Sequence, residues 1–280
     1  MNRARCFRGF TLVEMLVATA VLSMMVLLLI QVLNYTSAVW TLSQAQSDRR
    51  QSARAVGDAI AQELQAALMP LDPADQKSLQ FTLNSPLVPA GYCSADTIFW
   101  QAPIATDRHY GDVAEVGYFL KWDQTRPGNP RPLLCRFFVN PSDTTNYAII
   151  QKPDQWLVSD VQGHPNILDR VAPANNQSGN GYAGLFAENV IGFWVRCYDQ
   201  NGVVARIYDS RQKTVLPRTV KVFLVLVGPG SLARLTTIPD YTRAGSGDEP
   251  NLEAFIAALP TGVRETARTY TTEVRLQNAL

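Results

Sequence analysis

The feature that most constrains this chain is an uncharged apolar run near its N-terminus. Residues 15–30 carry no charge, and only Thr19 and Ser23 among them are polar. Apolar neighbours on both sides extend the run to about 24 residues, enough for a helix to cross roughly 30 Å of hydrocarbon. We therefore expect a transmembrane segment over about residues 12–34.

The residues before this run give it an orientation. Residues 1–9 contain Arg3, Arg5 and Arg8 and no acidic side chain. Because excess Lys and Arg mark the cytoplasmic side, we expect a single-pass protein with its N-terminus in the cytoplasm and most of the chain outside. A secretory signal peptide has a similar layout, but its apolar region is shorter, and residues 34–38 only weakly suggest a cleavage site.

Glu14 is the one residue that a plain anchor leaves unexplained. It lies within the apolar stretch that begins at Phe10. An acidic residue at the centre of a membrane helix costs about 2.5–3.5 kcal/mol, and less near the interface. Such a charge is by default functional, and we expect it to have a specific partner.

The sequence Gly-Phe-Thr-Leu-Val-Glu at residues 9–14, with basic residues before it and an apolar run after it, resembles the N-terminal signal of type IV pilins and type II secretion pseudopilins. The resemblance implies cleavage by prepilin peptidase between Gly9 and Phe10, followed by N-methylation of Phe10. It also implies that Glu14 pairs with the terminal amine of a neighbouring subunit. The leader, residues 1–9, would leave, and the anchor would stay.

The same resemblance implies the surroundings of the protein. Its partners would be prepilin peptidase, other pilin or pseudopilin subunits, an inner-membrane assembly platform and membrane lipid. It would reside in a bacterial inner membrane with its head in the periplasm, from where it could be extracted into a periplasmic fibre. Loss of three Arg with the leader changes the formal net charge from +1 to −2, which argues against nucleic-acid binding.

The distribution of proline predicts one long helix over residues 10–69. All 17 prolines lie at or after Pro70, and Gly57 is the only glycine in that stretch. A helix interior excludes proline and disfavours glycine. We expect the helix from about Thr11 to Leu68, with any interruption at 34–37. Its second half has an apolar stripe that we expect to pack on a sheet, formed by Ala53, Val56, Ile60, Leu64 and Leu68.

Residues 70–280 are predicted to form a β-rich head, so the fold class is α+β with a pilin-like arrangement. Short apolar runs separated by turn residues predict strands at 96–101, 115–122, 133–139, 188–198, 203–208, 218–227 and 270–276. We expect the first three to form an antiparallel meander, the turn at 199–202 to join a hairpin, and 218–227 to be a central strand. A helix at 250–258 would be capped by Asp248.

The order of segments in the head is similar to that of the larger J-type minor pseudopilin of type II secretion, mainly over residues 189–199 and 216–222. The extension at about 231–280 departs from that pattern. Its length and ending resemble the Verru_Chthon cassette protein C group, pseudopilin-like proteins of undefined role. The machine that the subunit would serve therefore stays open among type II secretion, type IV pili, competence systems and this cassette group.

The cysteines allow at most one bridge within a subunit. Cys6 leaves with the leader, and Cys93, Cys135 and Cys197 remain on the oxidising side of the membrane. By alternation Cys135 and Cys197 both point inward, where they form a disulfide pair or act as small core residues. No Cys-x-x-Cys spacing indicates a metal or redox site.

No constellation of residues predicts an enzyme. The two histidines, His109 and His164, lie in loop-like sequence, and no nucleophile, dinucleotide or phosphate-binding motif accompanies them. Asp248 and Glu249, in the loop at 245–249, are weak candidates for calcium ligands, since some pseudopilins use loop calcium. They lack EF-hand spacing, so a flexible acidic loop is the expected reading, and we expect no cofactor.

These observations predict a minor pilin or pseudopilin-like fibre subunit. Because a head of about 210 residues would crowd a densely packed shaft, we expect a position at the tip, as the J-type resemblance implies. The alternative is a membrane-anchored module that binds a ligand or surface, with residues 140–182 as its candidate site.

Overall fold

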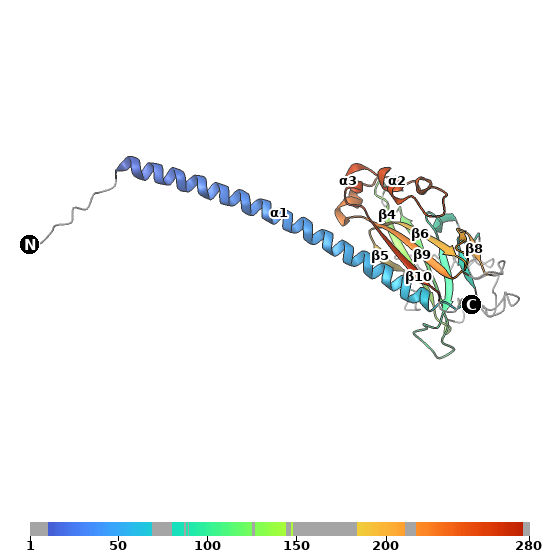
Figure 1. Ribbon diagram of the computed structural model, residues 1–280. Helices are drawn as coiled ribbons and strands as arrows, with labels where there is room; N and C mark the ends of the chain where they lie inside the picture. The colour runs from blue at the N-terminus through green and yellow to red at the C-terminus, as the bar shows by residue number, and fades with distance from the viewer. Residues whose placement is uncertain are drawn as a thin grey trace, which may run out of the picture. The chain divides into compact units, whose positions relative to one another are not determined.

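The computed structural model (Figure 1) has an α+β fold, with a long N-terminal helix followed by antiparallel sheets. The chain divides into two compact units, residues 1–50 and residues 51–280. The structure describes residues 11–68, 80–86, 88, 90–124, 127–143, 147, 184–210 and 217–276.

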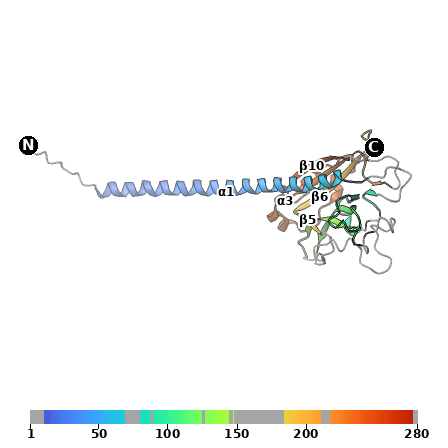
Figure 2. The same cartoon turned by 90° about the horizontal axis from the view of Figure 1, so that it is seen from below.

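Helix α1 (Leu12–Gln65) is continuous and has no break at 34–37. Its first part, Leu12–Ser37, is long and apolar enough to cross a membrane, and none of it is buried. Its last turns belong to the head: Ile60 and Leu64 are fully buried there. The predicted long helix is confirmed (Figures 1 and 2), and so is the apolar stripe as far as Leu64, whereas Leu68 lies beyond the end of the helix.

The first sheet, sheet A, is antiparallel, and its strand order is β5-β4-β3-β2-β1-β8. Its strands are β1 (Phe81–Leu83), β2 (Ile98–Ala102), β3 (Ala114–Asp123), β4 (Arg131–Val139), β5 (Leu185–Glu188) and β8 (Tyr208–Asp209). The predicted meander is confirmed as β2-β3-β4, in which Trp100 lies opposite Val116 and Phe119 opposite Cys135.

The second sheet, sheet B, has the order β10-β9-β6-β7. Its strands are β6 (Val190–Tyr198), β7 (Val204–Ala205), β9 (Thr219–Leu226) and β10 (Arg268–Arg275). The central strand β9, the terminal strand β10 and the turn before β7 are confirmed. In that turn the Gly202 backbone N–H donates to the Asp199 carbonyl at 3.1 Å.

The single return strand predicted at 203–208 is wrong. After β7 the chain leaves sheet B and enters sheet A as β8, where Leu83 lies opposite Tyr208. In sheet A, Tyr208 packs edge-on against Phe81 at 5.9 Å between ring centroids, inside the main core. An alternation of apolar and polar residues predicts a strand, but it does not predict which sheet the strand joins.

Three clusters of buried side chains hold the head together. The main cluster lies between the last turns of α1 and the facing sides of both sheets, with Trp100, Phe193 and Leu224 among its members. A second cluster, which includes Phe99 and Phe119, covers the opposite side of sheet A. Together they bury side chains from both faces of sheet A, since successive residues of a strand point to opposite sides.

The third cluster covers the opposite side of sheet B, beneath residues 227–267, which we call the cap. The cap consists of four short helices, η5 (Pro229–Arg234), η6 (Tyr241–Ala244), α2 (Leu252–Ala257) and α3 (Thr261–Arg264). Phe255 packs edge-on against Trp194 with ring centroids 4.9 Å apart. The Tyr241 hydroxyl donates to the Ile191 carbonyl at 2.8 Å, which ties the cap to β6.

The N-cap residue predicted for the helix at 250–258, Asp248, is wrong. Helix α2 begins at Leu252, and its N-cap is Asn251, whose Oδ1 accepts a hydrogen bond from the Ala254 N–H at 2.9 Å. Asn251 directly precedes the first turn, whereas Asp248 lies too early in the chain to reach an unpaired N–H of that turn.

Candidate functional site at the start of helix α1

Helix α1 begins with a reciprocal pair of hydrogen bonds between Thr11 and Glu14. The Glu14 backbone N–H donates to Thr11 Oγ1 at 3.2 Å, and the Thr11 N–H donates to Glu14 Oε2 at 3.4 Å. This is a capping box, in which side chains at the N-cap and third helical position satisfy two otherwise unpaired donors. The positive end of the helix dipole favours the Glu14 carboxylate at the same place.

The capping box gives Glu14 a local partner that our sequence analysis missed. The Thr-x-x-Glu spacing at residues 11–14 was the available signal. At 3.2 and 3.4 Å its two bonds lie at and just beyond the long end of the normal range, and an ionised carboxylate offers about four acceptor sites. Glu14 is also exposed. The carboxylate can therefore accept further hydrogen bonds from a donor outside this chain.

Three hydroxyls along this part of helix α1 have their partners within the helix itself. The hydroxyls of Thr19, Ser23 and Thr36 donate to backbone carbonyls three or four residues earlier, at 2.8–2.9 Å. Such back-bonding satisfies a hydroxyl inside its own helix. Glu14 is the only charged residue between Leu12 and Ser37. The run therefore presents a largely apolar surface with a single charged side chain near its start.

The comparisons with known proteins bear on this same stretch. Residues 4–30 match the family described as the prokaryotic N-terminal methylation motif. No curated protein and no solved structure matches the chain. The chain thus carries a prepilin-type signal, which supports a pilin-like subunit that prepilin peptidase processes. The expected cleavage and methylation positions, Gly9 and Phe10, lie outside the residues that the structure describes.

The structure does not bring Cys135 and Cys197 together. Cys135 lies in the cluster behind sheet A, with Leu133 and Phe137, whereas Cys197 lies in the main core. Both are buried thiols, and neither forms a disulfide. The alternation predicted their inward direction correctly, but it could not report that they face different cores. Cys93, at the surface, is also in no disulfide.

Glu249, one of the weak calcium candidates, is part of an ion pair. Its Oε1 lies 2.8 Å from Lys221 Nζ and accepts a hydrogen bond from the Tyr198 hydroxyl at 3.2 Å. The hydrogen bond from Lys221 is the main cause that lowers the pKa of Glu249. Within the part of the chain that the structure describes, no group of three or more His, Cys, Asp or Glu side chains could hold a metal ion, so Asp248 and Glu249 gain no third ligand there.

Of the two histidines, the structure describes only His109. His109 is exposed, and its backbone N–H donates to Asp107 Oδ1 at 3.1 Å, an ordinary turn contact. Of the loop proposed as a ligand site, only residues 140–143 and 147 are described; His164 and the rest lie outside the described residues. Among the described candidates, Glu14 is therefore the one whose setting points to a function.

Proposed function

We propose that this chain is a minor subunit of a pilin-like or pseudopilin fibre, cleaved between Gly9 and Phe10 and methylated at Phe10. The observation that carries the proposal is Glu14, a lone exposed carboxylate in a capping box at the start of an apolar helix. The match of residues 4–30 to the N-terminal methylation motif supports it.

The capping box explains how the subunit can be stored before assembly. A carboxylate near hydrocarbon is costly unless donors surround it. Thr11 and the helix N-terminus supply donors to Glu14 while the subunit is alone in the membrane. In the fibre, the terminal ammonium of a neighbouring subunit supplies a stronger, charge-assisted partner. The two opposite charges then neutralise each other where neither is well solvated.

The size of the head supports a low-copy position at the tip of the fibre. The unit at residues 51–280 includes two sheets and the cap in addition to the last turns of α1. A head of that size would crowd a shaft in which the N-terminal helices pack side by side. The subunit would then serve protein secretion or pilus biogenesis by starting the fibre rather than extending it.

The test is a Glu14→Ala variant expressed in cells that assemble the fibre. We expect it to insert in the membrane and to be cleaved normally, but to be missing from sheared or purified fibres. Thr11→Val is the matched control: it removes the capping hydroxyl, leaves the carboxylate and should still be incorporated. Normal incorporation of Glu14→Ala into fibres would mean that Glu14 has no role in assembly and that the apolar run is only a membrane anchor.

The tip position requires a separate experiment. Deleting the gene should abolish fibre initiation or secretion, and gold-labelled antibody against the head should mark one end of each fibre. Fibres that form normally without the gene, or label along their length, would contradict a tip role and leave subunit membership intact.

A further inference from the structure

The head contains an open groove, separate from Glu14 and the apolar run on which the proposed fibre role rests. It is lined by the segment before β2, by Trp194 on β6, by Arg206 after β7 and by the part of the cap at 241–246, and it has a volume of about 1010 Å³. This volume is at the upper end of the range of ligand pockets, about 300–1,000 Å³. A single small ion would leave most of it empty.

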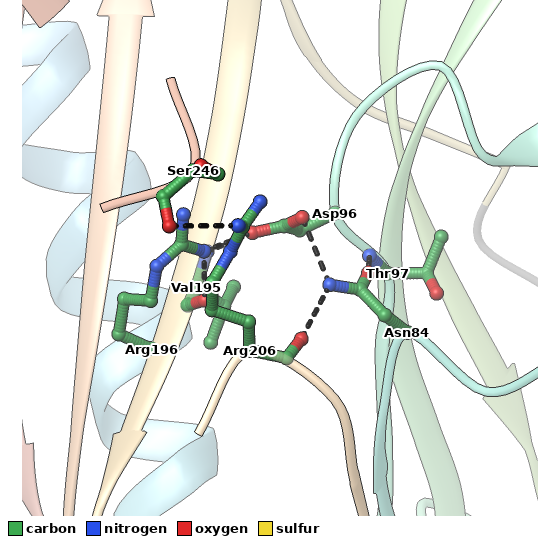
Figure 3. A network of polar contacts seen from close by, with 7 residues as sticks. All are labelled: Asn84, Asp96, Thr97, Val195, Arg196, Arg206 and Ser246. Atoms are coloured by element: carbon green, nitrogen blue, oxygen red, sulfur yellow. Dashed lines mark hydrogen bonds and ion pairs between the residues drawn. The ribbon is translucent and has the colours of Figure 1, made fainter. Parts of the chain in front are cut away.

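A polar network fixes one wall of the groove (Figure 3). Asp96 Oδ2 accepts from Arg196 Nη1 at 2.7 Å and from the Val195 N–H at 2.9 Å, while its Oδ1 accepts from Asn84 Nδ2 at 2.9 Å. The side chains of Arg196 and Asp96 are 1% and 16% exposed. The single carboxylate at this wall is therefore already neutralised by a buried guanidinium.

Arg206 lines the same groove, but unlike Asp96 it has no oppositely charged partner among the described residues. Asn84 Nδ2 donates to the Arg206 carbonyl at 2.8 Å, which fixes its backbone, and Arg206 Nη1 donates to the Ser246 carbonyl at 2.9 Å. Among the residues that the structure describes, no carboxylate forms an ion pair with Arg206. A guanidinium has five N–H donors and favours carboxylates. Arg206 therefore offers an exposed positive charge with donors to spare.

Apolar side chains and a sheet edge adjoin this charge. Val203 and Ile207, three residues before and one residue after Arg206, are 64% and 67% exposed. In the described part of the head, Tyr110 is the only other large apolar side chain exposed to this degree. Strand β7 is the last strand of sheet B, so its outer edge has no partner strand among the described residues.

We propose that this groove and the outer edge of β7 bind an extended acidic segment of a partner polypeptide. A carboxylate of the segment pairs with Arg206, and its apolar side chains cover Val203 and Ile207. An open sheet edge accepts such a segment by backbone hydrogen bonds, while side-chain pockets select its sequence. We expect the segment to be acidic because Arg206 is positively charged and unpaired with a carboxylate among the described residues, whereas Asp96 is already neutralised by Arg196. The proposal rests on the head alone and holds whichever machine the subunit serves.

The test uses the full chain in detergent and an eight-residue fluorescent peptide of alternating Glu and Val. We expect the peptide to bind, and Arg206→Glu to weaken it at least about tenfold. Arg275→Glu makes the same change on β10, at the opposite edge of sheet B, and should leave binding unchanged. A peptide with Gln in place of Glu should bind about tenfold less tightly than the Glu peptide.

Cys93, which lines the groove, provides a second readout. In a Cys6→Ser chain, bound peptide should slow maleimide labelling of Cys93, and Arg206→Glu should abolish this protection. Three outcomes would overturn the proposal: absence of binding, equal binding of the Gln peptide, or equal weakening by Arg275→Glu. Complete displacement by millimolar inorganic phosphate, or by micelles containing an anionic phospholipid, would assign Arg206 to a simple phosphate or lipid headgroup site instead.

Discussion

Glu63 Oε1 lies 2.7 Å from Arg136 Nη2, across the boundary between the last turns of α1 and strand β4 of sheet A. Glu63 Oε2 accepts a hydrogen bond from Arg136 Nε at 3.1 Å and another from the Tyr118 hydroxyl at 2.6 Å. Such a two-pronged contact holds a carboxylate at a defined position and angle. The end of the helix is therefore fixed to the sheet by more than apolar packing.

Breaking this contact should destabilise the head strongly. The two side chains are 17% and 19% exposed, so Glu63→Ala leaves the Arg136 charge largely desolvated and unpaired. We expect the free energy of unfolding to fall by about 3 kcal/mol, as measured by denaturant titration of the full chain in detergent. Asp112→Ala is the control, because the Arg108–Asp112 pair is 70% and 67% exposed and should contribute less than about 1 kcal/mol. Equal losses in the two variants would contradict the prediction.

Gly57 should show a change of sign that depends on Tyr270. A Cβ added at Gly57 would lie 2.1 Å from Tyr270 Cε1, so Gly57→Ala forces the ring aside and should cost about 1–3 kcal/mol. In a Tyr270→Ala background the clash is gone, and the same substitution should stabilise the helix by about 1 kcal/mol. Thermal unfolding of the four proteins measures this double-mutant cycle. If Gly57→Ala changes the stability in the same direction in both backgrounds, the contact with Tyr270 is not the reason that glycine is needed at position 57.

The buried thiols should be unreactive in the folded protein. Burial raises the pKa of Cys135 to about 12 and raises the pKa of Cys197 well above its ordinary value. Since the thiolate is the nucleophile, a Cys6→Ser chain at pH 7 should take up one maleimide, at Cys93, when folded. It should take up three after unfolding without reductant, counted by mass spectrometry. A single addition after unfolding would instead reveal a bridge between Cys135 and Cys197.

The ion pair between Lys221 and Glu249 should make a small, pH-dependent contribution to stability. Their hydrogen bond lowers the pKa of Glu249 and raises that of Lys221. The contribution is therefore present between about pH 4.3 and pH 10.4, and it is lost as Glu249 protonates below this window or Lys221 deprotonates above it. Because the side chains are 26% and 53% exposed, Glu249→Gln should cost at most about 1 kcal/mol at pH 7 and less at pH 3, since the contribution declines as the pH falls toward the lowered pKa of Glu249.

Denaturant titrations at both pH values, repeated in a Lys221→Met background, check this prediction. Without Lys221 the substitution at Glu249 should have the same small effect at pH 3 and pH 7. A pH-dependent loss that survives in the Lys221→Met background would assign the effect to another partner, such as the Tyr198 hydroxyl.

The sequence predicted those parts of the fold that depend on local patterns. The absence of proline before Pro70 predicted helix α1, and short apolar runs between turn residues predicted the meander and the terminal strand β10. It did not predict the short strands β1 and β5, because three or four residues are too few to show a period. The division of the strands into two sheets was also missed, since it depends on which strands meet in space.

The candidate site was predictable only in part, for a similar reason. Glu14 was identified because a charge in an apolar run is costly, and its capping partner Thr11 was readable three residues away. Glu63 and Arg136 are separated by 73 residues in the sequence. Arg206 is held in the groove by hydrogen bonds with Asn84 and Ser246, which are also far from it in the sequence. No local spacing reports contacts over such separations.

The cap has a consequence for how heads of this kind can diverge. Leu226 at the end of β9 lies directly opposite Arg268 at the start of β10, so the chain leaves and re-enters sheet B at one point. The cap is thus an insertion at the tip of a hairpin, and its length can drift without shifting the register of either strand. A homologue with a tight turn in its place would keep the sheet, but should carry polar side chains where this chain has Ile191, Phe223 and Val225.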